Sequence, residues 1–367
     1  MRRSRRISSQ LWGVIILGVV AIAGMIAIAA GCGTKEEVVP VAAGGSGTVQ
    51  RRAITKIAIA TPGSADDLSW NQRSVEGARQ AAEEAGVTIE VADASGFANV
   101  PAVLARLASG GADLIIAHAR RYRPAAIEAA TELGVPILAY GNLSGPSELA
   151  ANISVQSEQG AYLAGVLAAR MTRTSRLGIV ISAVDTDWFR QAGGFVAGAR
   201  SVNPIIQIRL AQLGQAADDD AARGFGVTSS VIKDGVDVVF GMGNRSANGM
   251  LRAVAAARPP GSADKVWFID TIGDRSSLDT KGVLLTSVLY DFSGAFKQAI
   301  DDVNVGFFAG EHYLLHLGNG GISLLRTPGI PDDVWQQVEK ARLAIVDGGI
   351  EIPVKQSRKD VERLIEH

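Results

Sequence analysis

Short apolar runs that alternate with amphipathic stretches constrain the fold of this chain more than any other feature. Between these runs, apolar side chains recur with helical spacing, first over residues 75–85. Parallel strands covered by helices on both faces have this pattern, because neither face of such a sheet meets water. We therefore predict an α/β fold made of βαβ units. The predicted strands are residues 56–60, 114–117, 136–139, 177–181, 236–240 and 265–269.

A similar sequence occurs in each half of the chain. GADLII at residues 111–116 and GVDVVF at residues 235–240 each follow a predicted helix. This similarity indicates two doubly wound parallel-sheet lobes. Ligands of open parallel sheets bind beyond the carboxyl ends of the strands, so we expect the function in the cleft between the two lobes.

Composition excludes several classes of function. The 367 residues include 36 Lys and Arg against 37 Asp and Glu, and basic residues cluster only at the N-terminus. Nucleic-acid binding therefore has no electrostatic basis. The chain has one cysteine, which rules out an intrachain disulfide and a thiolate metal cluster. The fold must be stabilised by apolar burial.

The N-terminus reads as an export and anchoring segment. Four arginines precede an apolar run over residues 11–31, which ends in Ala30, Gly31 and Cys32. A bacterial lipobox places small residues before a cysteine, whose thiol takes a diacylglyceryl group and whose amine takes a fatty acid such as palmitate. We expect residues 1–32 to be a signal peptide with Cys32 lipidated, which places the protein on the extracytoplasmic face of the cell membrane. The length of the run also suits an uncleaved transmembrane helix.

A polar loop follows the first predicted strand. Its residues include Asp67, Ser69, Trp70 and Asn71. The acid and hydroxyl groups suit a helix N-terminus. An aromatic ring beside two amides suits a binding loop at the strand ends, and the alternative is a helix cap in which Trp70 only packs.

These residues belong to a wider resemblance. SWNQ at residues 69–72, the strand at 113–116, QGAYLAGVLAA at 159–169 and GARSVNP at 198–204 resemble motifs of the basic membrane protein family, in an order that continues to residue 354. The family comprises substrate-binding lipoproteins and includes purine nucleoside receptors of ABC importers. The resemblance implies the type I periplasmic-binding-protein fold, with three crossovers as the hinge.

The resemblance also implies domain boundaries. After the anchor, residues 33–53 are too poor in periodic apolar residues to pack, so their composition predicts a flexible linker. Residues 54–145 and 290–312 form the first lobe, and residues 146–289 and 313–355 form the second. Residues 356–367 form a C-terminal tail.

Carried over residue by residue, the family's nucleoside site is only partly present. Trp70 matches an aromatic that stacks on the base, and Asn71 matches its polar neighbour. At the position of the family's second aromatic residue, this chain has Gln191, so that ring is lost unless Trp188 or Phe189 replaces it. We therefore expect a ligand that differs from the usual purine nucleosides.

Ribose recognition changes as well. At the position where the family has an acidic residue that binds the ribose, this chain has Ile272, although Asp270 and Asp274 lie in the same loop. At the position of a family lysine, this chain has Tyr290. Arg120, Arg121 and Tyr122 either add donors for an anionic group or are solvated surface side chains. The predicted ligand-binding residues are Trp70, Asn71, His118, Arg190, Asn248, Asp274 and Tyr290.

Catalysis, cofactors and metals have no support in the sequence. The glycine-containing loop at residues 241–249 lacks the third glycine of a dinucleotide fingerprint. His312 and His316 are four residues apart, but the sequence between them reads as a strand, and no third ligand is near. We expect a protein that is not an enzyme and has no cofactor.

The function that follows is capture of a small metabolite for an ABC importer. Its expected partners are that ligand, the permease subunits and the membrane, with no nucleic acid, and the protein is expected to be a monomer. The alternative is a sensing lipoprotein that presents its ligand-bound form to a membrane receptor.

Overall fold

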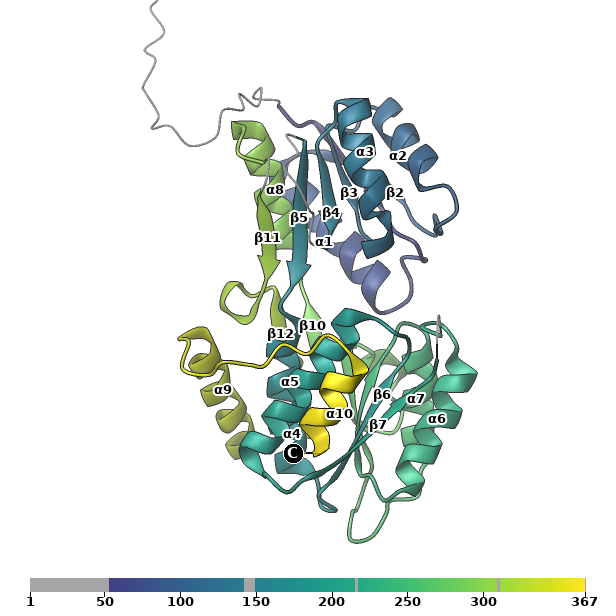
Figure 1. The fold of residues 1–367 in the computed structure, drawn as a ribbon, viewed down its shortest axis with the longest axis vertical. Coiled ribbons are helices and arrows are strands. Elements are labelled where there is room, and N and C mark those ends of the chain that lie inside the picture. Colours follow the sequence, from purple (N-terminus) through teal and green to yellow (C-terminus); the bar gives the residue numbers. More distant parts are fainter. Residues whose placement is uncertain (1–52, 142–148, 215–216, 309–310, 367) are drawn as a thin grey trace, which may run out of the picture. The chain divides into compact units, whose positions relative to one another are not determined.

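The computed structural model describes residues 53–141, 149–214, 217–308 and 311–366. The predicted anchor with Cys32 and nearly all of the predicted linker lie outside these residues. The described chain forms two six-stranded sheets with helices on both faces of each (Figure 1). The predicted α/β fold of two doubly wound lobes is therefore confirmed.

The first sheet has the strand order β11-β5-β4-β3-β1-β2, and its strand pairs are parallel. Helices α1 and α8 contribute to the core on one face, and helices α2 and α3 to the core on the other. The elements are β1 (Lys56–Ala60), α1 (Trp70–Ala85), β2 (Thr88–Ala92), α2 (Val100–Ser109), β3 (Leu114–Ala117), α3 (Arg123–Leu133), β4 (Ile137–Tyr140), β5 (Ala150–Val155), α8 (Ser293–Val305) and β11 (His312–Leu315).

The second sheet has the strand order β12-β10-β9-β8-β6-β7, and only β12 is antiparallel to its neighbour. Helices α4 and α5 cover one face, and α6 and α7 cover the other. The elements are α4 (Ser157–Met171), β6 (Arg176–Ile181), α5 (Thr186–Val202), β7 (Gln207–Gln212), α6 (Ala221–Lys233), β8 (Val238–Met242), α7 (Ser246–Ala256), β9 (Trp267–Ile272), β10 (Leu284–Tyr290) and β12 (Ile322–Leu324).

Two of the predicted lobe boundaries need correction. Strand β5 was assigned to the second lobe, and it pairs with β4 in the first sheet. Strand β11 pairs with β5 and extends the first sheet to Leu315, beyond the predicted boundary at residue 312. The chain therefore crosses between the sheets after β5, after β10 and after β11. Strand β5 carries polar residues and formed no recognisable apolar run, whereas the residues of β11 read as a strand but did not show which sheet they join.

The predicted C-terminal tail contains a helix. Helix α10 (Arg358–Glu366) packs against α5, and helix α9 (Asp332–Val346) packs against α4. The Arg200 guanidinium on α5 donates to the carbonyl oxygen of Leu364 at 2.6 Å and to that of Ile365. These bonds satisfy carbonyls at the end of α10 that have no partner within the helix.

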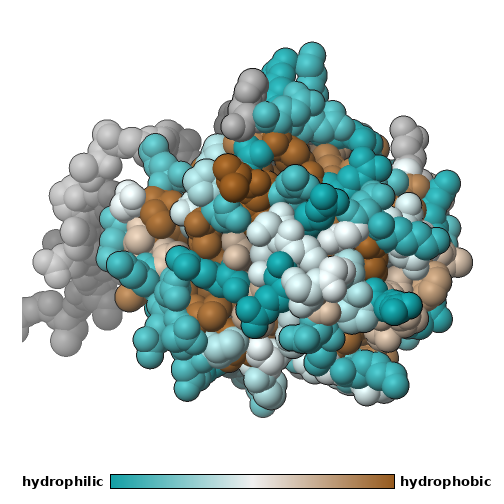
Figure 2. Space-filling model, turned by 90° about the horizontal axis from the view of Figure 1, so that it is seen from below, coloured by the Kyte–Doolittle hydropathy of each residue, from teal (hydrophilic) through white to brown (hydrophobic). Residues whose placement is uncertain are grey.

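Figure 2 shows the molecule from below, where brown hydrophobic patches are separated by hydrophilic surface.

Helices α4 and α5 approach each other closely through glycines. A Cβ atom added to Gly198 would collide with the carbonyl oxygen of Tyr162, and one added to Gly165 would collide with that of Phe195. The backbones meet because neither position carries a side chain. This packing fixes α5, whose first turns carry several of the polar side chains described below.

We predict that Gly198→Ala lowers the free energy of unfolding by about 1–3 kcal/mol, because the added methyl group forces the two helices apart. Gly226→Ala on α6 is the matched control, since a Cβ atom there meets no other atom within 4 Å. Alanine favours a helix over glycine, so the control should gain about 0.5–1 kcal/mol. Denaturant unfolding of both variants measures the difference, and equal effects would contradict the close approach.

Candidate functional site

Trp70 begins α1 at the carboxyl end of the first sheet and lies among other aromatic rings. Its ring stacks on His118 with centroids 4.3 Å apart and planes at 24°. Tyr140 and Phe292 approach it edge-on at 4.6 and 5.5 Å. The indole N–H donates to the carbonyl oxygen of His118 at 3.2 Å. We call Trp70, His118, Tyr140, Tyr290 and Phe292 the aromatic cluster.

The loop before α1 is held by Asp67. Its buried carboxylate accepts the backbone N–H groups of Ser69 and Gln72 at 2.9 and 3.0 Å, where a helix start leaves N–H groups unpaired. The Asn71 amide donates to Asp67 at 2.6 Å and accepts the N–H of Gly63 at 3.1 Å. Asn71 is only 3% exposed, and its bonds hold the loop; direct contact of Asn71 with a ligand stays a prediction.

His118 follows β3 and is fully buried. Neither of its ring nitrogens has a hydrogen-bond partner among the described residues. Burial lowers the pKa of the imidazole from 6.5 to about 3, because the charged form would lose its hydration. The ring is therefore neutral at physiological pH and offers one donor and one acceptor.

The start of α5 brings second-lobe carboxylates to the first sheet. The Asp187 carboxylate accepts the Arg120 guanidinium at 2.7 Å and the Tyr140 hydroxyl at 2.8 Å. Asp185 caps α5 by accepting the N–H of Asp187 at 2.8 Å. Burial and the neighbouring Asp187 raise the pKa of Asp185. Arg120 of the first lobe is thus already paired with the Asp187 carboxylate of the second lobe.

Arg190 and Gln191 lie one turn further along α5. Arg190 forms a two-pronged pair with the buried Glu158, with both hydrogen bonds at 2.9 Å. Gln191 accepts the Thr271 hydroxyl at 2.7 Å. Both residues are therefore engaged within the second lobe, and Arg190 is not a free donor for a ligand.

Tyr290 ends β10, where the chain crosses back to the first lobe. The side chain is 2% exposed, and its hydroxyl has no hydrogen-bond partner among the described residues. Burial raises the pKa of this hydroxyl. Its backbone carbonyl accepts the Arg73 guanidinium at 2.9 Å. Tyr290 thus brings an unpaired neutral polar group to the aromatic cluster.

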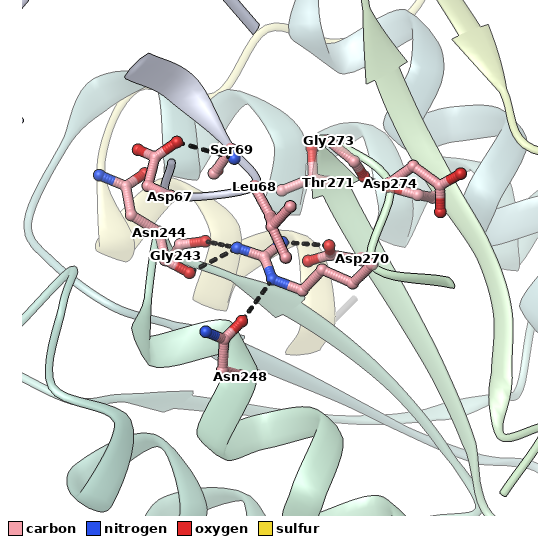
Figure 3. Close-up of polar contacts among 12 residues, drawn as sticks. Asp67, Leu68, Ser69, Gly243, Asn244, Asn248, Asp270, Thr271, Gly273 and Asp274 are labelled. Carbon is pink, nitrogen blue, oxygen red and sulfur yellow. Dashed lines mark hydrogen bonds and ion pairs between the residues drawn. The ribbon is translucent and has the colours of Figure 1, made fainter. Parts of the chain in front are cut away.

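The most buried charge in this region is Arg275. Its guanidinium pairs with Asp270 and donates to Asn248 Oδ1 at 2.9 Å and to the carbonyl oxygen of Asn244 at 2.5 Å (Figure 3). Both members of the Asp270–Arg275 pair are fully buried. Burial raises the pKa of Asp270 to about 6 even though the guanidinium lowers it. Asn248 therefore binds Arg275, and the exposed Asp274 accepts Ser276 at the start of a short 3₁₀ turn.

The loops of the two lobes touch beside this ion pair. A Cβ atom at Gly273 would collide with the carbonyl oxygen of Leu68, so only glycine permits the approach. Leu68 and Ile272 have φ values of 54° and 76°, a left-handed conformation that is unfavourable for non-glycine residues. An exposed ion pair between Asp66 and Arg245, at 2.5 Å, joins the same loops.

Other predicted residues have structural roles. Arg121 lies over the Phe97 ring at 4.2 Å, and the Tyr122 hydroxyl donates to Gly96 at 2.6 Å. Trp188 is buried and donates to Asp218 at 3.3 Å. His312 lies on β11 within 2.7 Å of Ser154, and His316 accepts the N–H of Gly318.

A hollow of about 420 Å³ lies elsewhere in the second lobe. Arg176, Gln207, Arg209 and Asp234 line it at the amino ends of β6, β7 and β8. Parallel sheets bind ligands at the opposite ends of their strands. Because the unpaired polar groups also gather at those opposite ends, we place the candidate site there and not in the hollow.

The sequence of this chain is similar to a known protein family. Residues 54–356 match the Bmp family, described as "ABC transporter substrate-binding protein PnrA-like". The chain belongs to this family. The family resemblance expected from the sequence motifs is thereby confirmed.

Two relatives illustrate the similarity of this Bmp-family chain. It is 30% identical over 207 residues to the nucleoside-binding protein BmpA of Lactococcus lactis, covering 54% of this chain and 58% of that protein. It is 24% identical over 310 residues to basic membrane protein A of Borreliella afzelii, covering 82% and 92%. The match thus spans less than two thirds of the length of BmpA.

Solved structures share the fold. A solute-binding protein from Conexibacter woesei has a TM-score of 0.69 at 20% identity, over 82% of this chain and 99% of that one. One from Aeropyrum pernix K1 has a TM-score of 0.70 at 21% identity, over 85% and 96%. These likenesses confirm the two-lobed type I fold.

Buried polar atoms without partners gather at the carboxyl ends of the strands of this Bmp-family protein. Seven such atoms lie in or just after a strand or at a helix start, and the described residues contain four others, Ser157 Oγ, Arg200 Nε, Gln212 Nε2 and Thr228 Oγ1. The seven are Ser69 Oγ, both ring nitrogens of His118, Arg120 Nε, Ser246 Oγ, Asp270 Oδ1 and Tyr290 Oη. An unpaired buried polar atom costs roughly 1–3 kcal/mol, so this concentration is the main physical sign of a ligand site.

Sequence reasoning missed Tyr140, Asp187, Arg275 and Phe292. Tyr140 and Asp187 carried a signal, because Tyr140 ends an apolar run and Asp187 follows the strand at 177–181 after a short loop. Arg275 carried none, because its partners Asn244 and Asn248 come from another loop. Phe292 lies just after the predicted lobe boundary between residues 289 and 290, but nothing in the sequence marked its ring as part of the site.

We predict that the free energy of unfolding decreases as the pH is lowered, and that His118 causes part of this decrease. Its folded-state pKa is below the ordinary value, so the unfolded chain binds more protons as pH falls from about 6.5 towards 3. Between pH 7 and 5, the wild type should lose roughly 1–2 kcal/mol more unfolding free energy than His118→Phe. Urea unfolding at both pH values measures this, and an equal loss in both proteins would mean that the imidazole is not buried as described.

Proposed function

We propose that this chain is the extracytoplasmic substrate-binding component of an ABC importer and holds a nucleoside or nucleoside-like metabolite between its two lobes. The observation that carries the proposal is the set of unpaired buried polar atoms towards the carboxyl ends of strands in both sheets, which includes His118, stacked on Trp70. A ligand with donors and acceptors would pair them and offset their cost. The name of the Lactococcus lactis relative, a nucleoside-binding protein, supports this class.

Capture would proceed by closure of the lobes. Trp70, His118 and Tyr140 come from the first lobe, whereas Asp187, Asp270 and Arg275 come from the second. A ligand in contact with both sets favours the closed arrangement, because contacts to the second set exist only there. The ion pairs Arg120–Asp187 and Asp66–Arg245 would stabilise that arrangement. The closed form would then be the one that meets the permease subunits.

A lipid anchor at Cys32 would hold the binding domain at the membrane. We propose that Cys32 is lipidated and that the protein acts as a monomer on the extracytoplasmic face of the cell membrane. In the part of the chain that the structure describes, no helix is both long and apolar enough to span a bilayer. The proposal also gives the protein no catalytic activity, in keeping with relatives that are named for binding.

We predict that Trp70→Leu lowers affinity for the bound metabolite by at least about five-fold, because stacking on an aromatic ring contributes about 1–3 kcal/mol per base. Trp335→Leu on α9 is the matched control, since that half-buried ring contacts Arg326 at 5.5 Å, away from the aromatic cluster. The full-length protein in detergent would first be screened by thermal unfolding against nucleosides, nucleobases, pentoses, polyols and carboxylates.

Calorimetric titration of the strongest hit then compares the two variants. Loss of binding in Trp70→Leu alone supports the proposed site. Equal affinities in both variants and the wild type would place the ligand elsewhere.

A further inference from the structure

We infer that the ligand is an uncharged planar heterocycle without a sugar, of the free nucleobase class, and that Arg275 excludes the sugar. This inference rests on the proposed function and narrows it. Three features of the described residues carry it: an aromatic wall with neutral unpaired groups, charges that are already paired, and a polar subsite filled by the chain itself.

The aromatic cluster offers neutral hydrogen-bonding groups. The unpaired atoms there are the two His118 nitrogens, the Tyr290 hydroxyl and the neighbouring Ser69 hydroxyl. Burial keeps His118 neutral and Tyr290 protonated. Such groups supply both donors and acceptors without charge, which matches the edge of a heterocycle that carries ring N–H groups and carbonyl oxygens.

The arginines around the site each have a carboxylate partner. Arg120 pairs with Asp187, Arg190 with Glu158, Arg275 with Asp270 and Arg245 with Asp66. An anionic ligand would have to take an arginine from its carboxylate and leave that carboxylate without a partner. The paired charges therefore select against carboxylates and phosphates.

Two further carboxylates, Asp185 and Asp218, are also engaged. Asp185 accepts the N–H of Asp187, and Asp218 accepts the Ser182 hydroxyl and the Trp188 indole N–H. Burial raises the pKa of both, which shows that they lie in surroundings that disfavour charge. Both carboxylates therefore already accept hydrogen bonds from the chain.

Arg275 fills the subsite that would otherwise bind hydroxyl groups. Asp270, the side-chain oxygen of Asn248 and the carbonyl of Asn244 are acceptors that converge at the ends of β8 and β9 (Figure 3). A sugar would donate its hydroxyls to such acceptors. The guanidinium of Arg275 binds one oxygen of Asp270 and the oxygens of Asn248 and Asn244, and it is 0% exposed; the second Asp270 oxygen, Oδ1, has no partner among the described residues. Arg275 thus determines specificity by occupying the place of the sugar.

The experiment compares a base with its own nucleoside. Hypoxanthine, inosine and ribose are titrated separately into the full-length protein in detergent at pH 7, by isothermal calorimetry. We expect hypoxanthine to bind at least 10-fold more tightly than inosine, and ribose to give no binding. Inosine binding as tightly as hypoxanthine, or tighter, would overturn the inference and leave the proposed function intact. If neither binds, another nucleoside as the strongest hit of the screen would do the same, whereas another nucleobase as the strongest hit would support the inference. A pentose, a polyol or a carboxylate as the strongest hit would overturn both the inference and the proposed nucleoside-like ligand. Silence across the whole screen would overturn both.

A variant tests the role of Arg275 itself. The double variant Asp270→Asn with Arg275→Met removes both buried charges and opens the acceptors to a ligand hydroxyl. Its inosine-to-hypoxanthine affinity ratio should rise at least 10-fold over the wild type. Arg326→Gln, which removes an exposed ion pair with Asp332, is the control and should leave the ratio unchanged. An unchanged ratio in a folded double variant would overturn the role of Arg275, and the wild-type titrations stand whether or not the variant folds.

Discussion

The buried pair of Arg275 and Asp270 is the interaction on which the arrangement of the second lobe's strand ends depends. Removing two charges from water is costly, and the attraction between them offsets this only when the remaining hydrogen-bonding positions are filled. Here the guanidinium also binds Asn248, at the start of α7, and the carbonyl of Asn244, in the loop after β8. One side chain therefore fixes two loops and the end of β9 together.

The loop that follows β9 also makes a close contact with the loop before α1 in the first lobe. Gly273 lies two residues before Arg275, and the carbonyl of Leu68 approaches it too closely for any side chain at that position. Leu68 and Ile272 both hold left-handed backbone conformations at this contact, each at a cost of order 1–3 kcal/mol. Strain of this kind persists where the surroundings impose it and gathers at ligand clamps. It coincides here with the unpaired polar atoms, so two independent physical signs point to the same edge.

The fold could be predicted where burial is two-sided. Strands β1 and β3 lie inside the first sheet and coincide with predicted apolar runs at residues 56–60 and 114–117. Strands β2 and β7 are edge strands, whose partly exposed residues broke the pattern and concealed them. Such strands are recognisable only after the sheet order is known.

The candidate site was predictable only for groups whose role is local. Trp70 begins a helix, His118 follows a strand and Tyr290 ends one; the Trp70 and His118 rings stack, and the Tyr290 ring lies edge-on to Phe292, which also contacts Trp70. Asn71, Arg190 and Asn248 were predicted as ligand contacts, but they bind Asp67, Glu158 and Arg275. A sequence shows which side chains carry hydrogen-bonding groups, whereas the fold decides which of these groups are already used.

The account is tested most directly by a crystal structure of the full-length protein with the most tightly bound compound from the screen. We predict that the compound lies against Trp70 and accepts or donates a hydrogen bond at His118 or Tyr290, with the Arg275–Asp270 pair intact. A compound seated in the hollow lined by Arg176 and Gln207, with the aromatic cluster unchanged, would contradict it.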